Sequence, residues 1–169
     1  MGSSRTAVEP KKGRSDAKSR ADPLSPEFRL MYWPFFHMNR AIRSYDTEMK
    51  KLLKSEKLDV ARWRILMVAH EHEPVSVGEV AEETIMEPST AMRAMQSLQR
   101  DALVTIVTRQ SDQRVSEAQL TAKGRVTTDR VLKAASRVYR QAFESFDAAQ
   151  IETLIGLLAQ VHRALRDPI

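Results

Sequence analysis

The amino-acid sequence predicts an all-α fold with one small β-ribbon. Apolar residues recur at alternating steps of three and four in three long stretches, which is the spacing of one helix face. Two β-prone segments, Leu103–Thr108 and Val115–Leu120, flank a polar turn that runs from Arg109 to Arg114. The helical stretches lie toward the two ends of the chain, and the ribbon lies between them.

Residues 1–25 are expected to form a disordered basic tail. They are rich in Ser, Lys, Arg and Pro and poor in large apolar residues, so burial cannot offset the entropy of ordering them. The first 20 residues hold six basic and two acidic residues, which accounts for four of the net charge of +5. The overall charge therefore does not by itself indicate a nucleic-acid partner. The tail is either a solvated segment or an arm that contacts DNA.

Residues 26–57 and 121–169 are predicted to form dimerisation helices at the two ends of the chain. A capping box at Asp147 and Gln150 marks the start of the last helix. Because the apolar stripes are far apart in sequence, we expect them to meet in a helical bundle, within one subunit or between two. The stripes are Phe35, Met38, Ile42, Tyr45, Met49 and Leu52; Leu132, Ala135, Tyr139, Ala142 and Phe146; and Ile151, Leu154, Leu158, Val161 and Leu165.

Residues 58–120 are predicted to form a separate module in the middle of the chain. A helix over Val60–His72 ends before Pro74, which cannot continue it. Ser76 and Glu79 then have the spacing of a capping box, which opens a short helix.

The next helix of this module begins at Pro88 and extends to about Ala102. Proline suits the first turn of a helix, because its missing N–H would be unpaired there. The short helix runs through Thr84, and a tight turn, the second helix and the β-hairpin follow it. This is the element order of a winged helix-turn-helix, in which the second helix enters the major groove of DNA.

The second helix of the module has two different faces. One face is apolar and suits a core: Ala91, Ala94, Met95, Leu98 and Ala102. The opposite face has hydroxyls, an amide and guanidinium groups, and no acid. Such side chains bond phosphates and base edges, arginine pairing with guanine and glutamine with adenine; an ordinary solvated face is the alternative. The candidate DNA-binding residues of this face are Ser89, Thr90, Arg93, Gln96, Ser97 and Arg100.

Four sequence blocks resemble the MarR family of bacterial transcription regulators. Leu103-Val104 resembles the family's leucine–valine pair at the entry of the wing, and Asp112-Gln113-Arg114 resembles its Asp-x-Arg. Leu120-Thr121-Ala122-Lys123-Gly124 resembles the Leu-Thr-x-x-Gly that starts the following helix, and Trp63-Arg64-Ile65-Leu66 matches a stretch of an earlier helix. The resemblance covers roughly Pro34 to the C-terminus, with the blocks in order and without a gap.

The resemblance implies roles for the ribbon, which is then the wing. Arg114 would reach the minor groove or the adjacent phosphates, and Asp112 would orient the wing by pairing with an arginine. A charged hydrogen bond can fix the tip of a two-stranded ribbon that is only marginally stable alone. A plain exposed ion pair is the alternative for Asp112.

The chain departs from the family pattern at two places. Ala102 stands where the family often has a glycine as helix C-cap, and Ile106 and Val107 stand where it often has arginine. The second departure removes positive charge from the base of the wing. We therefore expect DNA affinity to depend more on Arg109, Arg114 and the basic tail.

The resemblance also implies a small-molecule effector, since family members commonly bind aromatic anions between the dimerisation helices and the DNA-binding module. Five of the ten aromatic residues fall within residues 28–36, and cationic side chains follow them. An aromatic wall beside a cation suits an aromatic carboxylate or an acyl-CoA thioester, whereas packing in a dimer core is the alternative. The candidate ligand-binding residues are Trp33, His37, Arg40 and Arg43; Trp63 is expected in the core.

The composition excludes several classes of protein. No apolar run approaches the ~20 residues that span a bilayer, and residues 1–20 lack the apolar segment of a signal peptide. Without cysteine there is no disulfide, thiolate nucleophile or thiol redox sensor. We expect a cytoplasmic protein of one domain.

No enzymatic or metal site is expected. The sequence has no placeable Ser/His/Asp pattern, glycine-rich phosphate loop or zinc ligand set. His70 and His72 are two positions apart, so on a helix they point about 200° from each other and cannot chelate together. No cofactor is expected beyond the effector.

Together these observations predict a homodimeric, sequence-specific DNA-binding regulator without enzyme activity. Two recognition helices would enter successive major grooves of a pseudo-palindromic operator, with half-sites about 10 bp apart. A ligand would release this repressor by favouring a dimer geometry that no longer fits B-DNA. A ligand-independent DNA-binding regulator and a non-DNA interaction module are the alternatives.

Overall fold

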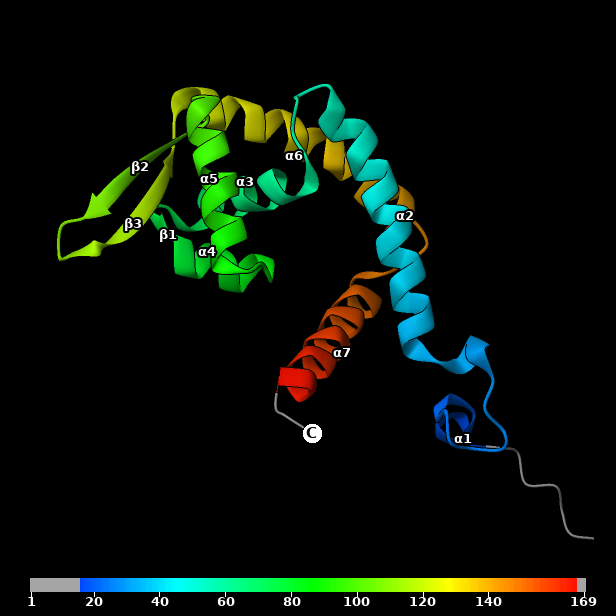
Figure 1. The fold of residues 1–169 in the computed structure, drawn as a ribbon. Helices are drawn as coiled ribbons and strands as arrows, with labels where there is room; N and C mark the ends of the chain where they lie inside the picture. Colours follow the sequence, from blue (N-terminus) through cyan, green and yellow to red (C-terminus); the bar gives the residue numbers. More distant parts are fainter. Residues whose placement is uncertain (1–15, 167–169) are drawn as a thin grey trace, which may run out of the picture. The chain divides into compact units, whose positions relative to one another are not determined.

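The computed structural model describes residues 16–166, which form helices and one small sheet (Figure 1). The chain divides into two compact units, Met1–Ser44 and Tyr45–Ile169, and helix α2 contributes to both. The elements are α1 (Ala17–Ala21), a 3₁₀ turn (Leu30–Tyr32), α2 (Pro34–Lys54), α3 (Val60–His72), β1 (Val75–Ser76), α4 (Val77–Thr84), α5 (Pro88–Arg100), β2 (Val104–Arg109), β3 (Asp112–Leu120), α6 (Ala122–Phe143) and α7 (Ala148–Arg166).

In the first unit, part of the segment that was expected to be a disordered tail is helical. Residues 1–15 lie outside the described residues, but the next ten contain helix α1, capped by Asp16. Arg20 lies 3.9 Å from the ring centroid of Tyr32 and donates a hydrogen bond of 2.6 Å to its hydroxyl. The hydroxyls of Ser19 and Ser25 are 2.8 Å apart. The contact with Tyr32 and the contact between Ser19 and Ser25 thus accompany regular structure in a segment whose own composition predicts disorder.

The core of the second unit is built by α3, α4, α5 and the inner face of the sheet. Trp63 is 1% exposed, as expected for a core residue. Met49 and Leu53 at the end of α2 and Val131 of α6 join the same cluster. The core thus joins the helix-turn-helix to the adjoining ends of the long helices.

The sheet has three antiparallel strands in the order β1-β3-β2. Val104 pairs with Leu120 and Ile106 with Ala118, which places their side chains on the core face. Strand β1 is an addition to the predicted ribbon, and its Val75 pairs with Ala118. The turn at the tip is shorter than predicted, because strand pairing continues to Arg109, which lies opposite Asp112. The pairing has an irregularity between Thr108 and Arg109.

Local sequence signals place the helix starts correctly. Ser76 and Glu79 form both hydrogen bonds of the capping box, and Asp147 and Gln150 do the same before α7. Pro88 lies in the first turn of α5. The structure adds one cap that the sequence reading missed: the Asp59 side chain accepts from the Arg62 backbone N–H at the start of α3.

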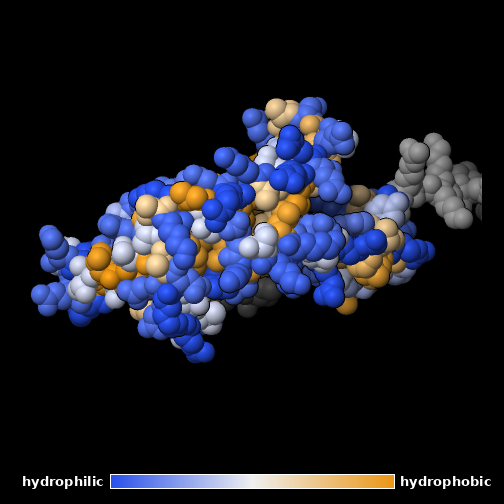
Figure 2. Space-filling view, turned by 90° about the horizontal axis from the view of Figure 1, so that it is seen from above, coloured by the Kyte–Doolittle hydropathy of each residue, from blue (hydrophilic) through white to orange (hydrophobic). Residues whose placement is uncertain are grey.

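Helix α7 has no buried residue in the single chain. Large apolar side chains also reach the surface elsewhere, and Figure 2 shows them in small groups among polar ones on the face seen from above. Along α7 the exposed apolar residues are Ile155, Leu157, Leu158 and Leu165. Among the described residues, no helix is both long and apolar enough to cross a membrane.

Candidate nucleic-acid interface

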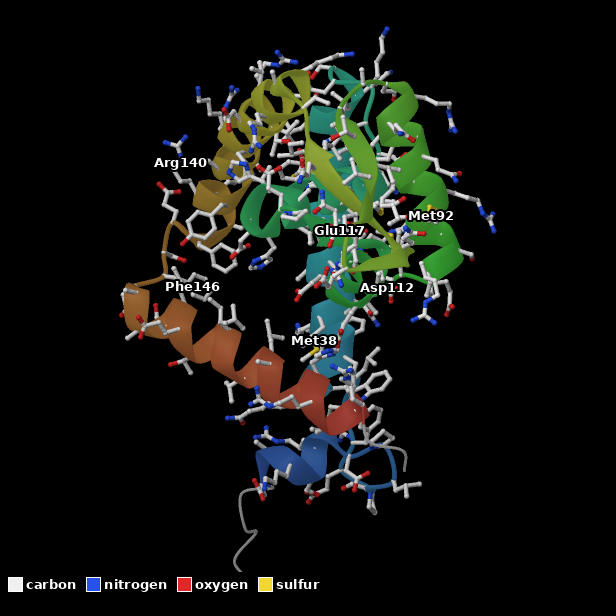
Figure 3. The ribbon with its side chains drawn as sticks, turned by 90° about the vertical axis from the view of Figure 1, so that its left-hand side faces the viewer. Met38, Met92, Asp112, Glu117, Arg140 and Phe146 are labelled. Atoms are coloured by element: carbon white, nitrogen blue, oxygen red, sulfur yellow. The ribbon has the colours of Figure 1, made fainter. Side chains whose placement is uncertain are left out.

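Helix α5 separates its apolar and polar residues as the sequence predicted, except that Ala102, which was expected on the apolar face, is exposed and lies beyond the end of the helix. Ala91, Met95 and Leu98 are fully buried, and Ala94 is partly buried against the core. Side chains that end in nitrogen project from the outer side of this helix (Figure 3). Ser89, Thr90, Arg93, Gln96 and Arg100 are exposed on it, and Ser97 is half-buried. This face is therefore a polar, acid-free surface held on a rigid helix.

A tight turn sets α5 against α4. Helix α4 ends at Ile85, whose backbone is left-handed (φ 54°), and the Met86 N–H donates 2.9 Å to the carbonyl of Ala81. The Ile85 side chain is 78% exposed, so it does not pack into the core. Pro88 follows two residues after Met86 and begins α5. The pair α4–α5 is thus a helix-turn-helix with α5 as the second helix.

The C-terminus of α5 is fixed from two directions. Arg62 of α3 donates 2.9 Å from Nη1 to the Asp101 carboxylate, and Lys123 of α6 donates 2.7 Å to the Asp101 carbonyl. The hydroxyl of Thr121 donates 2.8 Å to the carbonyl of Ala102. Carbonyls at a helix end lack partners within the helix, so Lys123 and Thr121 satisfy them, whereas Arg62 holds the Asp101 side chain. Sequence reasoning missed Arg62 and Lys123, because their partners lie 39 and 22 residues away.

The surroundings of Gly124 explain why the Leu-Thr-x-x-Gly block has a glycine at this position. A Cβ at this position would lie 1.9 Å from the carbonyl oxygen of Leu103, which no real contact permits. The Gly124 N–H donates 2.9 Å to the hydroxyl of Thr121, which caps α6. Glycine therefore lets the start of α6 lie directly against the base of the wing.

The wing is the ribbon of β2 and β3, and Asp112 and Arg114 pair at its tip. The Asp112 carboxylate accepts from the backbone N–H of Arg114 at 3.0 Å and from its Nε and Nη2 at 3.1 and 3.2 Å. These hydrogen bonds lower the pKa of Asp112. The Arg114 side chain is still 90% exposed. The arginine that pairs with Asp112 is thus Arg114 itself, and its guanidinium stays open to solvent.

Arg109 is held differently. Its Nε donates to the carboxylate of Glu117, whose side chain is only 11% exposed. This hydrogen bond raises the pKa of Arg109, and the nearby charges of Glu117, Glu79 and Asp112 act in the same direction. Sequence reasoning proposed Arg109 for DNA contact but missed Glu117, because a single acid in a strand carries no signal of its own.

The residues proposed for ligand binding lie in the first unit, on α2 and just before it. The rings of Trp33 and Phe35 meet edge to face at 5.8 Å, and Nε2 of His37 is 2.7 Å from the carbonyl oxygen of Met31. The Arg40 guanidinium lies 5.3 Å from the ring centroid of Phe36. Arg43 is on the same helix. The structure thus brings aromatic and cationic groups together along one short segment.

Comparison with known proteins identifies the family. The model of the MarR family matches residues 57–115. The chain is 30% identical over 147 residues to the HTH-type transcriptional repressor IacR of Pseudomonas putida. The aligned stretch covers 87% of this chain and 88% of the relative. The chain belongs to the MarR family. The resemblance noted in the sequence is therefore confirmed, and the members of this family are transcriptional regulators.

Solved structures agree with the fold. A MarR-family transcriptional regulator from Silicibacter pomeroyi superposes with a TM-score of 0.72 at 25% identity, over 79% of this chain and 90% of that one. BpsR of Bordetella bronchiseptica, whose DNA binding is regulated by 6-hydroxynicotinic acid, superposes with a TM-score of 0.65. BpsR is 18% identical to this chain, and the superposition covers 74% of this chain and 95% of BpsR. At this identity the likeness supports the fold alone. The predicted fold, a winged helix-turn-helix within an all-α frame, is confirmed.

Proposed function

We propose that this MarR-family protein is a cytoplasmic, sequence-specific DNA-binding repressor that acts as a homodimer. The observation that carries the proposal is the outer face of α5, which holds two arginines, a glutamine and three hydroxyls without an acid. Its C-terminus is fixed by Arg62, Lys123 and Thr121. Rigid placement of such groups is what base recognition in the major groove requires.

The contacts divide by chemistry. Arg93 and Gln96 project from the middle of α5 and would read bases. The hydroxyls of Ser89, Thr90 and Ser97, with Arg100, would bond phosphates and fix the register. In the wing, Arg114 would reach the minor groove or its phosphates.

Asp112 and Arg109 have supporting places in this scheme. Asp112 aligns the Arg114 side chain through three hydrogen bonds, without covering it. Arg109 adds positive charge near the wing tip, but its guanidinium is bonded to Glu117. The strength of any contact between Arg109 and DNA therefore depends on that pair.

The exposed apolar side of α7 supports a homodimer. Ile155, Leu158 and Leu165 are between 42% and 61% exposed in the single chain. The exposure of these apolar side chains to water along one helix of 19 residues is energetically unfavourable. A second copy would cover them and bring two recognition helices to one operator. A palindromic operator mirrors such two-fold symmetry.

An aromatic carboxylate or an acyl-CoA thioester is the effector class that we propose. The support is chemical: Trp33 with Phe35 offers aromatic surface, and His37, Arg40 and Arg43 follow on the same helix. The regulation of BpsR by 6-hydroxynicotinic acid, an aromatic carboxylic acid, is in keeping with this class. A regulator that binds DNA without an effector is the second candidate. A titration of DNA-bound protein with aromatic acids and thioesters, followed by tryptophan emission and DNA release, separates the two.

Selection of binding sites from random duplex DNA tests the proposed function. The full-length protein should enrich an inverted repeat whose half-site centres are about 10 bp apart. A variant with Arg93→Ala and Gln96→Ala is the control and should enrich no repeat while keeping its thermal midpoint. Enrichment of no sequence by the native protein would contradict the proposal.

A further inference from the structure

The pair of Arg109 and Glu117 occupies the outer face of the wing. In the strand register Arg109 lies opposite Asp112, and Glu117 lies opposite Val107. The guanidinium of Arg109 nevertheless turns back along the ribbon to the Glu117 carboxylate. Figure 3 labels Glu117 and Asp112 on the same strand, β3. The irregularity between Thr108 and Arg109 accompanies this reversal.

The burial of the two wing arginines' partners differs sharply. The Asp112 side chain, partner of Arg114, is 37% exposed, whereas that of Glu117 is 11% exposed. Glu117 is also flanked by β1, since it pairs with Ser76 in the sheet register. A DNA phosphate can replace Asp112 as the partner of Arg114, because water then solvates the released carboxylate. Moving Arg109 to a phosphate would leave the carboxylate of Glu117 buried and unpaired, which is strongly unfavourable.

The charges of the wing balance. Between Val104 and Leu120 there are two arginines and two acids, Asp112 and Glu117, so the segment has no net charge. Sequence-independent binding to DNA depends on cations that neutralise phosphates. A wing without net charge and with one arginine held by a buried acid contributes little to such binding.

We propose that Glu117 is a positioning residue that withholds Arg109 from the DNA backbone, so that Arg114 is the arginine through which the wing contacts DNA. This inference rests on the proposed function, because it concerns how strongly the wing holds a DNA duplex. It assigns to Glu117 a role in setting affinity and salt dependence, and it makes Arg109 a part of the wing's own structure.

Substitution of the pair by glutamine tests the proposal. Glu117→Gln keeps the shape of the side chain but removes the charge that holds Arg109, which then becomes available as one more phosphate contact. The log–log slope of affinity against salt should become steeper by about 0.9, equally on the selected site and on random duplex. The ratio of the DNA affinity of Glu117→Gln to that of the native protein should therefore fall about 3.5-fold when the salt concentration rises from 50 to 200 mM.

Two further variants make the test decisive. The double variant, Arg109→Gln with Glu117→Gln, removes both charges of the pair and therefore leaves no buried carboxylate unpaired. It should cancel the gain of Glu117→Gln and return the native affinity and slope. Glu71→Gln, an exposed acid on α3, changes the net charge equally and should not steepen the slope. Thermal midpoints establish that each variant folds.

The outcomes separate this proposal from the proposed function. If the double variant instead binds more weakly than the native protein and lowers the slope by about 0.9, Arg109 contacts DNA in the native protein and the proposal is overturned. If Glu117→Gln folds but its slope of affinity against salt equals the native slope, the proposal for Glu117 is also overturned. The proposed function then still stands, provided that the native protein binds its selected site. Failure of the native protein to bind any duplex would instead contradict the proposed function.

Discussion

Ala102 adopts a left-handed backbone conformation (φ 57°) directly after the end of α5. Its N–H donates 2.9 Å to the carbonyl of Gln99, and the Leu103 N–H donates 2.9 Å to that of Leu98. Helices commonly end in this way, with glycine at the left-handed position because a Cβ is unfavourable there. The missing glycine noted in the sequence is therefore a real site of backbone strain.

Ala102→Gly is expected to raise the free energy of unfolding by about 1 kcal/mol, because glycine relieves the left-handed strain. Urea denaturation followed by far-UV circular dichroism measures the change. Ala142→Gly, in the last turns of α6, is the matched control and should lower stability by about 1 kcal/mol. A loss of stability in Ala102→Gly would show that position 102 is not strained.

At this scale the sequence predicted the residues whose partners are close in the chain. Ser76 with Glu79 and Asp147 with Gln150 are three residues apart. For Asp112 the sequence indicated only that an arginine would be its partner, and in the structure this arginine is Arg114, two residues away. The sequence did not predict the pairs Arg109–Glu117 and Arg62–Asp101, because their members are 8 and 39 residues apart and only folding brings them together. Burial of an acid is a property of the assembled sheet, and no local pattern reports it.

At the scale of elements, α5, the wing and α6 meet at a tightly packed junction. Thr121 bonds the carbonyl of Ala102, and Gly124 lies against the carbonyl of Leu103. The end of the recognition helix, the start of β2 and the first turn of α6 are thereby held together.

Gly124→Ala should destabilise the protein by at least about 2 kcal/mol, because backbone atoms must shift to admit the new methyl group. It should also weaken binding to the selected DNA site. Gly78→Ala is the control, since a Cβ there meets only the hydroxyl of Ser76 at 3.9 Å; it should be neutral or raise stability. Equal thermal midpoints for both variants would refute the tight junction.

The elements could be predicted to different degrees. Long helices carry a repeated apolar pattern, so α2, α6 and α7 were found from the sequence, whereas the end of α3 was found from Pro74. Strand β1 has only two residues, Val75 and Ser76, and exists because β3 offers its edge. For the same reason β3 extends to Asp112, although polar residues there suggest a turn. Short strands depend on tertiary pairing more than on their own residues.

At the scale of the whole molecule, the main feature is the apolar stripe of α7, which no described part of the single chain buries. The sequence predicted its apolar stripe, and the structure leaves Leu158 and Leu165 exposed in the single chain. What covers the stripe could not be predicted from the sequence pattern, because helix pairing within and between subunits uses the same spacing. The proposed homodimer supplies one answer that can be tested.

Sedimentation should give about twice the chain mass of 19.2 kDa, and Leu158→Glu should shift the protein toward monomer. A charge placed in an apolar interface is strongly unfavourable when it has no partner. Gln160→Glu, an exposed polar position of the same helix, should leave the dimer unchanged. Removal of residues 147–169 should abolish the soluble dimer. A folded monomer that binds a palindromic site with native affinity would contradict this account.

The measurement that tests the central claim most directly is the effect of Arg93→Ala on two DNAs. Arg93 is exposed on the face of α5 assigned to base reading, so its loss should remove a contact worth about 1–3 kcal/mol on the selected site. Affinity for that site should fall by about tenfold or more, while affinity for random duplex at the same salt should change little. Equal losses on both DNAs would contradict the claim that α5 reads sequence through Arg93.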